Sequence, residues 1–475
     1  MIHSRVQVLA PTLLACLVSP ALAGSDPVPA TLEILRLDEF DGEVVGALNP
    51  PVTDGAGRGA VLMSFITGFG IWYDGAQIFN RDDALPLVLN TTSDRNIGIA
   101  DDGSFVFSAR CNSFDCVYTD EGVVLTEGDP APDAPAGVNI TEFARTTMTN
   151  AGVAYWIAGL NDGAGGTATI TNRLYRRATD GTISTVFAQG ETLGASTVGT
   201  IGPIYDVSGA NDHVIVTFID PTQPTTSDVR IAVNGVVVAG EGLPTGSGDN
   251  WDNFDGVSIN SSGDYAFIGD TDGNSNTDQF VAVNGAIVLR EGDITSAGTV
   301  NGNGTDAISI NDLGQLAIIW EMDLGASSGN TESLLFARDP ANIAGSLYRL
   351  LSLGDEIDTS GDGVADFRVQ DFRAAHTVGP GLDLAEDGRV FVRVDLDSID
   401  GTIVDDQALI SLALPTPCNI ADLADPFGTL DFSDVVAFLT AFGTMDTAAD
   451  LAPPTGVFDF SDVVAFLTAF GAGCP

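Results

Sequence analysis

A short loop near residue 360 carries oxygen-bearing side chains at alternating positions. In "DTSGDGVADF", the side chains of Asp358, Ser360, Asp362 and Asp366 and the backbone carbonyl of Val364 have the spacing that a hard cation needs. The loop therefore predicts a calcium site, with a polar surface turn as the alternative, because Asp, Ser and Gly are common turn residues. A second acid-rich loop, for which the turn is the better interpretation, contains Asp270, Asp272 and Asp278.

Side chains that commonly perform catalysis are scarce. The chain has no Lys, and beyond its first residues the only histidines are His213 and His376, whose neighbours suggest neither a triad nor a metal site. No G-x-S-x-G, P-loop or H-E-x-x-H motif is present. Paired carboxylates that cleave a glycosidic bond stay open as an alternative, because their pairing is spatial and leaves no mark in the sequence.

The last 60 or so residues contain a duplication. The segments "DLADPFGTLDFSDVVAFLTAFG" and "DLAPPTGVFDFSDVVAFLTAFG" share an identical "DFSDVVAFLTAFG". Each predicts an acidic loop that leads into a short helix, with Asp434 or Asp462 at its start. Helices this short are not stable alone in water, so the two must pack on each other. In the first copy, the predicted contact face consists of Val435, Phe438, Leu439 and Phe442.

This pair resembles a dockerin of the Cys-bracketed kind that anchors secreted bacterial proteins, over nearly all of Cys418 to Pro475. The resemblance implies one calcium per loop and a cohesin-like docking partner. The implied calcium ligands are Asp422, Asp425, Asp431 and Asp434 in the first copy and Asp450, Asp459 and Asp462 in the second. The implied partner-recognition residues are Phe432, Ser433, Phe460 and Ser461.

The loops depart from the dockerin pattern. Gly428 stands six positions after Asp422, where the family has five, and Pro453 stands where the first copy has Asp425. Calcium in one or both loops is the favoured interpretation. The alternative is that these aspartates only cap the helices, each stabilising its helix by about 1 kcal/mol.

The amino terminus predicts export. Arg5 is followed by an apolar run from Val6 to Val18 and by a small-residue cleavage site at Ala21–Ala23, so residues 1–23 are predicted to be a signal peptide. The protein is then secreted or extracellular and associated with the cell surface. No further apolar stretch is long enough to span a bilayer.

Four cysteines are left after export, an even number in a compartment where disulfides persist. Three pairings are possible, and proximity favours Cys111 with Cys116 and Cys418 with Cys474. Zinc is the less favoured alternative, because no histidine lies near either pair.

The formal net charge is -47, with 65 acidic and 18 basic residues. Such a surface repels nucleic acid and anionic lipid, which excludes both as partners. Because 44% of the residues are hydrophobic and the acids are scattered, the chain can bury a core.

Residues 24–415 are rich in alternating apolar and polar residues, which predicts an almost entirely β body. Two markers recur in step. The first is an N-x-x-G type turn, clear in "SINSSGDYAF" and "SINDLGQLAI", at Gly57, Gly103, Gly152, Asp212, Gly263, Gly314 and Gly388. The second is an apolar strand followed by Gly and an acid, at Gly128, Gly190, Gly242, Gly292 and Gly354. The glycine of the first marker suits a turn that needs positive φ.

Copies of a four-strand unit favour a β-propeller of seven blades, with a β-sandwich array or a β-helix as alternatives. The last copy lacks its final strand, and a matching strand, "ATLEILRLDEFD", stands near the amino terminus. The segment around Leu32 to Asp38 is therefore predicted to complete the last blade beside Ile410, which removes two exposed sheet edges.

The motifs "INSSGDYAF", "INDLGQLAI" and "MTNAGVAYW" resemble those of bacterial tandem-repeat NxxGxxAF, choice-of-anchor proteins. That resemblance implies a secreted repeat domain followed by an attachment module (416–475), and no known reaction. A non-catalytic binding or scaffold protein, contacting extracellular glycan or protein through the ring, is the favoured function. A propeller enzyme that acts on polysaccharide, as hydrolase or lyase, is the alternative.

Overall fold

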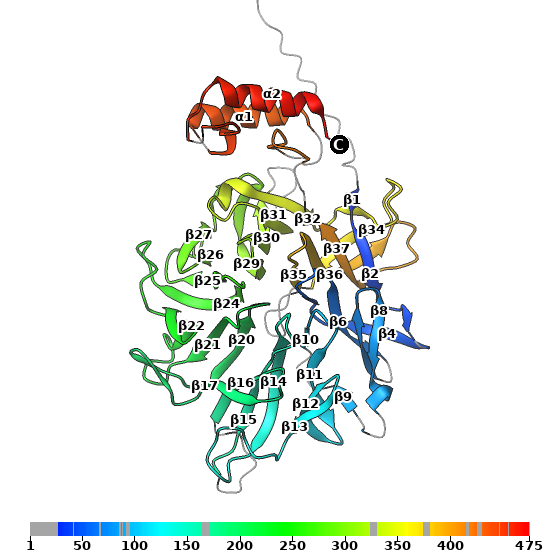
Figure 1. The fold of residues 1–475 in the computed structure, drawn as a ribbon, viewed down its shortest axis with the longest axis vertical. Helices are drawn as coiled ribbons and strands as arrows, with labels where there is room; N and C mark the ends of the chain where they lie inside the picture. Colours follow the sequence, from blue (N-terminus) through cyan, green and yellow to red (C-terminus); the bar gives the residue numbers. More distant parts are fainter. Residues whose placement is uncertain are drawn as a thin grey trace, which may run out of the picture.

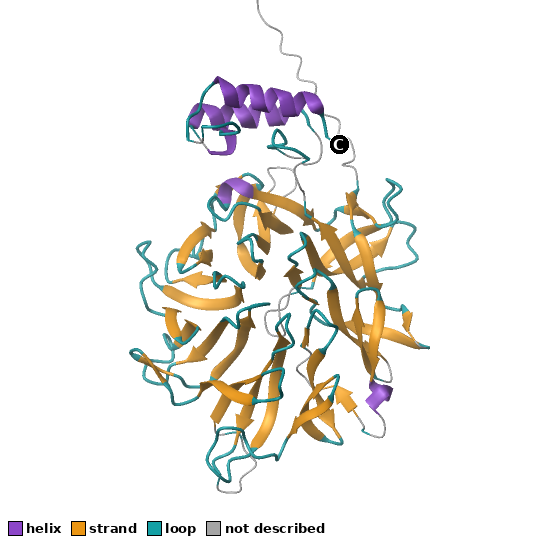
Figure 2. Ribbon diagram, in the orientation of Figure 1, coloured by secondary structure: helices purple, strands orange, loops and turns teal. Residues whose placement is uncertain are grey.

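The computed structural model describes residues 27–40, 42–65, 68–84, 87, 89–91, 96–163, 169, 171–323, 330–373, 381–414, 418–424, 430–445, 447–454 and 456–474. The predicted signal peptide, His376 and Asp425 lie outside these ranges. In the described part the fold is mainly β, with two α-helices near the carboxyl terminus (Figure 2). None of the described helices is long and apolar enough to cross a bilayer.

Antiparallel sheets stand around a central axis in the arrangement of a β-propeller, and the helical pair lies outside the ring (Figure 1). Seven sheets of the described chain have four or more strands. Their main strands, in the order in which they pair within each sheet, are β4 (Glu43–Leu48), β6 (Gly59–Phe65), β7 (Phe69–Tyr73) and β8 (Ala76–Asn80); β10 (Ile97–Ile99), β11 (Phe105–Cys111), β12 (Phe114–Thr119) and β13 (Gly122–Thr126); β14 (Ile140–Met148), β15 (Ala154–Leu160), β16 (Thr171–Arg177) and β17 (Ile183–Ala188); β20 (Ile201–Val207), β21 (Val214–Ile219), β22 (Val229–Val233) and β23 (Val236–Gly240); β24 (Trp251–Ile259), β25 (Tyr265–Thr271), β26 (Gln279–Val283) and β27 (Ala286–Arg290); β29 (Gly298–Ile310), β30 (Leu316–Asp323), β31 (Asn330–Ala337) and β32 (Leu347–Ser352); β34 (Phe367–Phe372), β36 (Arg389–Ser398), β37 (Asp406–Ala413) and β2 (Thr31–Leu35).

Short strands extend these sheets or form a two-stranded ribbon. They are β1 (Val28–Pro29), β3 (Glu39–Phe40), β5 (Val52–Thr53), β9 (Leu89–Thr91), β18 (Thr192–Leu193), β19 (Ser196–Thr197), β28 (Ile294–Thr295), β33 (Glu356–Asp358) and β35 (Leu382–Leu384). Single 3₁₀ turns occur at Arg81–Ala84, Ala344–Ser346 and Thr447–Ala449.

The ring closes through strands from opposite ends of the body, as predicted. β2 pairs antiparallel with β37, and Leu32 lies opposite Ile410. Strand β2 ends at Leu35, so residues 36–38 form the turn that follows it rather than part of the strand. The closure covers the edge of β37, and β2 becomes the edge strand of the last sheet.

The core consists of apolar clusters between successive sheets. Alternate residues of one strand serve different clusters: Phe267 of β25 packs toward β20–β23, whereas Ala266 and Ile268 pack toward β29–β32. The cluster that joins the last sheet to the first combines Ile34 and Leu409 with Val61, among others. Both faces of each middle strand are therefore buried, which explains their nearly continuous apolar sequences.

Turns around one end of the axis link neighbouring sheets. All seven residues of the first turn marker and all five glycines of the second have positive φ, between 53° and 95°, as predicted for the glycines of the first marker. In the clearest copy, Asn260 Oδ1 accepts the backbone N–H groups of Ser262 and Asp264, while its Nδ2 donates to the carbonyl of Asn311 in the next sheet. Such turns thus fix both the local chain reversal and the position of the neighbour.

Because Ile34 helps to close the ring, it should contribute more to the free energy of unfolding than a residue near a chain end usually does. Ile34 is fully buried between the last and first sheets, so Ile34→Ala should lower the free energy of unfolding by about 2–5 kcal/mol. The control is Leu37→Ala, because Leu37 is 63% exposed and its loss should cost less than about 0.5 kcal/mol. Urea unfolding of both variants, followed by tryptophan fluorescence, tests this, and equal effects would contradict it.

Candidate functional site

The C-terminal module is a pair of helices joined by a disulfide. α1 (Phe432–Thr444) and α2 (Phe460–Ala472) pack through Phe438 and Phe466, whose rings stack with centroids 4.3 Å apart. Cys418 is bonded to Cys474, and Cys111 to Cys116, so both predicted disulfides are confirmed.

The predicted contact face is wrong at one of its four residues. Phe438 is buried, and Val435 and Phe442 pack partly against it, but Leu439 is 60% exposed. The reason is the helical period: successive residues are about 100° apart, so Leu439 turns away when Phe438 points inward. The same holds in the second copy, where Leu467 is 58% exposed.

Leu439 instead belongs to an apolar stripe on the outer surface of its helix. Each stripe has residues at i, i+4 and i+7, and we call the two together the outer stripes. They consist of Phe432, Val436 and Leu439 on α1 and Phe460, Val464 and Leu467 on α2, all exposed. Phe432 and Phe460, the implied partner-recognition residues, are 77% and 76% exposed, and Ser433 and Ser461 beside them are exposed too.

The acidic residues of this module act on the backbone. Asp431 caps α1, and its Oδ1 accepts the N–H of Ser433 at 2.6 Å. Asp434 is buried; its Oδ1 accepts the N–H groups of Leu423 and Ala424, and its Oδ2 that of Asp431. One carboxylate therefore clasps the start of the helix to the preceding loop.

The second copy repeats this arrangement. Asp459 caps α2, and buried Asp462 accepts N–H groups from Leu451, Ala452 and Asp459 at 2.9 Å each. In this copy Asp450 Oδ2 accepts the N–H of Gly456. Asp422, in the first copy, accepts the N–H of Cys418 at 2.7 Å.

The loop at residues 358–366 is built in the same way. Asp358 accepts N–H groups from Ser360, Gly361 and Gly363, and Asp366 accepts those of Thr359 and Ser360. Asp362 accepts the N–H of Val364, whose side chain is exposed. These bonds close the polar turn that was the alternative to a calcium loop.

Most of the described carboxylates predicted to bind calcium also accept hydrogen bonds from the backbone. Within the described ranges, three His, Cys, Asp or Glu ligand atoms come within 4.8 Å of one another only at Cys418, Asp422 and Cys474, and there both cysteines form the disulfide. Because a carboxylate has about four lone-pair positions, an oxygen that accepts an amide hydrogen can also ligate a cation. Calcium stays a prediction from the sequence.

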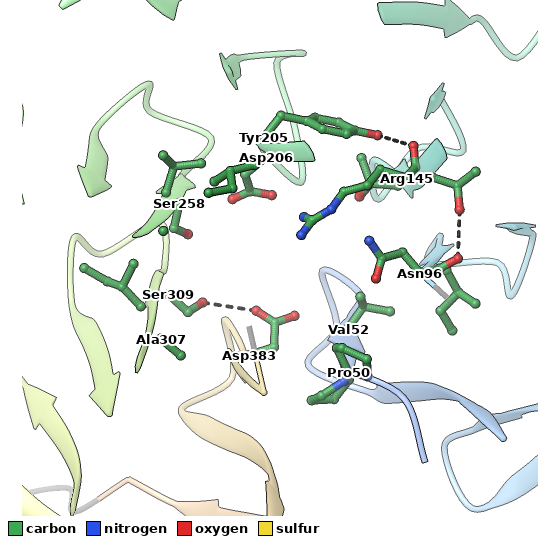
Figure 3. Close-up of a pocket in the computed structure, with 18 of the residues that line it drawn as sticks. Pro50, Val52, Asn96, Arg145, Tyr205, Asp206, Ser258, Ala307, Ser309 and Asp383 are labelled. Atoms are coloured by element: carbon green, nitrogen blue, oxygen red, sulfur yellow. Dashed lines mark hydrogen bonds between the residues drawn. The ribbon is translucent and has the colours of Figure 1, made fainter. Parts of the chain in front are cut away.

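A second candidate site lies at the axis of the ring and was not predicted from the sequence. A cavity of about 130 Å³ is bordered by the innermost strands of several sheets. Its polar lining includes Arg145 of β14, Asp206 of β20, Asp255 of β24 and Asp383 of β35. In Figure 3 the side chains of Arg145, Asp206 and Asp383 point from different strands into the same space.

Hydrogen bonds hold the two cavity aspartates in place. Asp206 accepts the N–H groups of Val207 at 2.8 Å and Ile259 at 3.0 Å. Asp383 accepts the N–H and hydroxyl of Thr53, at 2.7 and 3.0 Å, and the hydroxyl of Ser309 at 3.1 Å. Burial raises the pKa of Asp206 to about 6, with the charge of Asp383 acting in the same direction, and burial also raises the pKa of Asp383.

Two further charged residues that line the cavity lie at irregular positions of their strands. Arg145 and Asp255 each lie where the pairing register of their strand shifts, and Arg145 has φ 41°, in the left-handed region. Bulges redirect side chains, and residues held in this region cluster at functional sites. No local motif marks these residues, since they lie up to 238 positions apart (Arg145 to Asp383).

Loss of the Asp434 carboxylate should open the start of α1. Asp434→Ala leaves three backbone N–H groups without their acceptor, and each buried orphan costs about 1–3 kcal/mol. We expect faster hydrogen exchange across α1 in the full chain, measured by mass spectrometry with a chelator present, and no change for Ser433→Ala. Protection of wild-type α1 that appears only with calcium would contradict the carboxylate clasp.

The second loop should respond to acid. The N–H groups of Asp459, Ala452 and Leu451 hold the pKa of Asp462 below its usual value, against the opposing effect of burial. A lowered folded-state pKa contributes stability above the unfolded-state pKa, and that stability is lost as pH falls through the folded value. Exchange of α2 should therefore rise at pH values below the usual Asp range, and Asp462→Asn should show the fast exchange already at neutral pH. A flat profile for the wild type would refute this.

Searches of protein-family models and of curated proteins find no match to the chain. Among solved structures, a gluconolactonase from Xanthomonas campestris is 11% identical with a TM-score of 0.29, covering 82% of this chain and 99% of that one. An α-L-arabinofuranosidase from Fusarium graminearum is 11% identical (TM-score 0.30; 81% and 98% covered), and a polysaccharide lyase is 9% identical (TM-score 0.34; 84% and 94% covered). Similarities this low identify no family and no substrate.

Proposed function

We propose that this is a secreted, non-catalytic binding or scaffold protein that is tethered at the cell surface through its C-terminal module. The observation that carries the proposal is the pair of outer stripes. Single exposed apolar residues are common, but here two identical sets of three repeat at the same helical positions. Such surfaces mark sites of contact with another protein.

A cohesin-like domain is the proposed partner. The dockerin resemblance supports this choice, and so does the chemistry of the outer stripes, where Phe432 and Phe460 project most of their surface into solvent. Aromatic anchors of this kind dominate the binding energy of protein interfaces. A partner with an apolar surface flanked by hydroxyl-binding groups would bury one Phe and contact the adjacent Ser.

The ring is proposed to have seven blades, one for each described sheet of four or more strands, and to be the part that contacts an extracellular glycan or protein. The support for this count is that apolar clusters join each sheet to the next in chain order, and one joins the last to the first. A closed ring is a rigid platform on which loops and axial side chains keep fixed positions.

The second candidate function is that of a propeller enzyme that cleaves polysaccharide. It is favoured by Asp206 and Asp383, two carboxyls with raised pKa that share the axial cavity. Incubation of the secreted protein with a polysaccharide panel separates the two functions. New reducing ends or unsaturated products would establish the enzyme and overturn the non-catalytic proposal.

Docking should depend on the aromatic residues of both helices. The two outer stripes have the same sequence and nearly the same exposure, so Phe432→Asp or Phe460→Asp alone should leave one usable stripe. The double variant should lose binding by a factor of about 100 or more, since buried aromatic anchors contribute at least about 2 kcal/mol each.

The measurement is calorimetric titration of the full chain with a purified cohesin-like domain from the same organism. Val364→Asp is the control, because Val364 is also exposed but lies in the ring. Equal binding by the double variant and the control would rule out docking through the outer stripes.

A further inference from the structure

We infer that the cavity at the axis of the ring is a binding site for one neutral sugar ring, with Asp206 and Asp383 accepting hydrogen bonds from its hydroxyls and Arg145 donating to them. The inference gives a ligand class and a location to the proposed binding role of the ring. It does not involve the C-terminal module.

The size of the cavity suits a single ring. Its volume is about 130 Å³, and an engineered cavity of about 150 Å³ in another protein holds one benzene molecule. A sugar ring has comparable dimensions, so one residue of a glycan, or its terminal unit, would fill the space. A peptide segment or a folded partner would not enter it.

The lining offers both kinds of contact that a sugar needs. Apolar atoms come from Val52, Ile97, Ile204 and Val257, among others, and suit the C–H face of the ring. Polar groups come from the aspartates and from Ser258 and Ser309, which are almost fully buried. A mostly apolar pocket with a few placed polar groups is the usual composition of a small-molecule site.

The aspartates are held in place and still have acceptor capacity. A carboxylate has about four lone-pair positions, and Asp383 uses three of them for Thr53 and Ser309. Asp206 uses two for backbone N–H groups and one for the hydroxyl of Ser258. A hydroxyl that enters the cavity can therefore donate to either carboxylate without displacing the bonds that position it.

The charge balance selects a neutral ligand over an anionic one. Three aspartates, Asp206, Asp255 and Asp383, line the cavity with one arginine, Arg145, so the lining is net negative when the acids are ionised. The negative lining would repel a phosphate, sulfate or uronate, and in a partly enclosed space this repulsion is only weakly screened by water. The hydroxyls of a neutral sugar gain charge-assisted hydrogen bonds instead.

A divalent cation is the other ligand that such a field attracts. The cavity acids, however, do not bring three ligand atoms within 4.8 Å of one another, a grouping that among the described residues occurs only beside the Cys418–Cys474 disulfide. Acceptors spread around a space fit hydroxyls spread around a ring better than one ion.

The test is saturation-transfer NMR on the full secreted chain with methyl glycosides of glucose, galactose, xylose and arabinose, and with sodium glucuronate and calcium chloride as competitors. We expect at least one neutral glycoside to bind in the millimolar range. Asp206→Asn should weaken the signal, because Asp206 lines the cavity and the variant loses the charged acceptor. Asp383→Asn should weaken binding about tenfold or more, the factor expected for loss of a charge-assisted hydrogen bond.

Asp362→Asn is the matched control, since Asp362 is an exposed acid outside the cavity, and it should bind like the wild type. Thermal unfolding shows which variants are folded. If a variant is not folded, Arg145→Lys is measured in its place; it keeps the positive charge and should weaken binding of the glycoside. No binding by any neutral glycoside, stronger binding of glucuronate, competition by calcium, or full binding by both Asp206→Asn and Asp383→Asn would each overturn the inference. The Phe432→Asp/Phe460→Asp variant should bind glycoside normally, so a failure of docking is distinguishable from a failure here.

Discussion

The antiparallel pairing of β2 with β37 is the interaction on which the rest of the body depends. Each sheet buries its two faces only against its neighbours, so an open series would leave one apolar face uncovered at each end. Because Ile34 pairs with Leu409 in the last sheet and packs in one cluster with Val61 of the first, closure covers both of these faces. The pairing joins residues more than 370 positions apart, so the ring is complete only when both ends of the body are in place.

Much of this architecture could be predicted because its signals are local and repeated. Gly263 and Gly314 stand in turns where a side chain would be strained, and recurrence of that turn along the chain gives both the unit and its spacing. The missing last strand could be located because "ATLEILRLDEFD" has the same pattern as the strands it completes. The two disulfides follow from proximity in the chain.

The errors and omissions lie where local pattern is ambiguous. Leu439 is apolar and adjacent to Phe438, and apolarity alone does not show whether a side chain packs inside the module or faces a partner. The two side chains are one residue apart, which is a rotation of about 100° around the helix. The carboxylates of Asp358, Asp434 and Asp462 have a spacing that suits a cation, and they also accept backbone amides, so the sequence pattern alone does not separate these two roles. The axial cavity draws Arg145, Asp206 and Asp383 from three sheets, so no window of sequence contains it.

The same physical device recurs in the ring and in the module, and it explains part of the acidity of the chain. Asp101 accepts the N–H of Gly55 from the preceding sheet, Ser261 donates its N–H to Asp312 of the next, and Asp434 clasps the loop before α1. In each case a short carboxylate satisfies backbone donors that a turn or helix end leaves unpaired. An ionised acceptor makes a stronger bond to N–H than a neutral one, so aspartate suits these positions. Many of the 65 acids therefore need no cation to account for them, whereas Asp206 and Asp383, which face a cavity as well as the backbone, have acceptor capacity beyond what the fold uses.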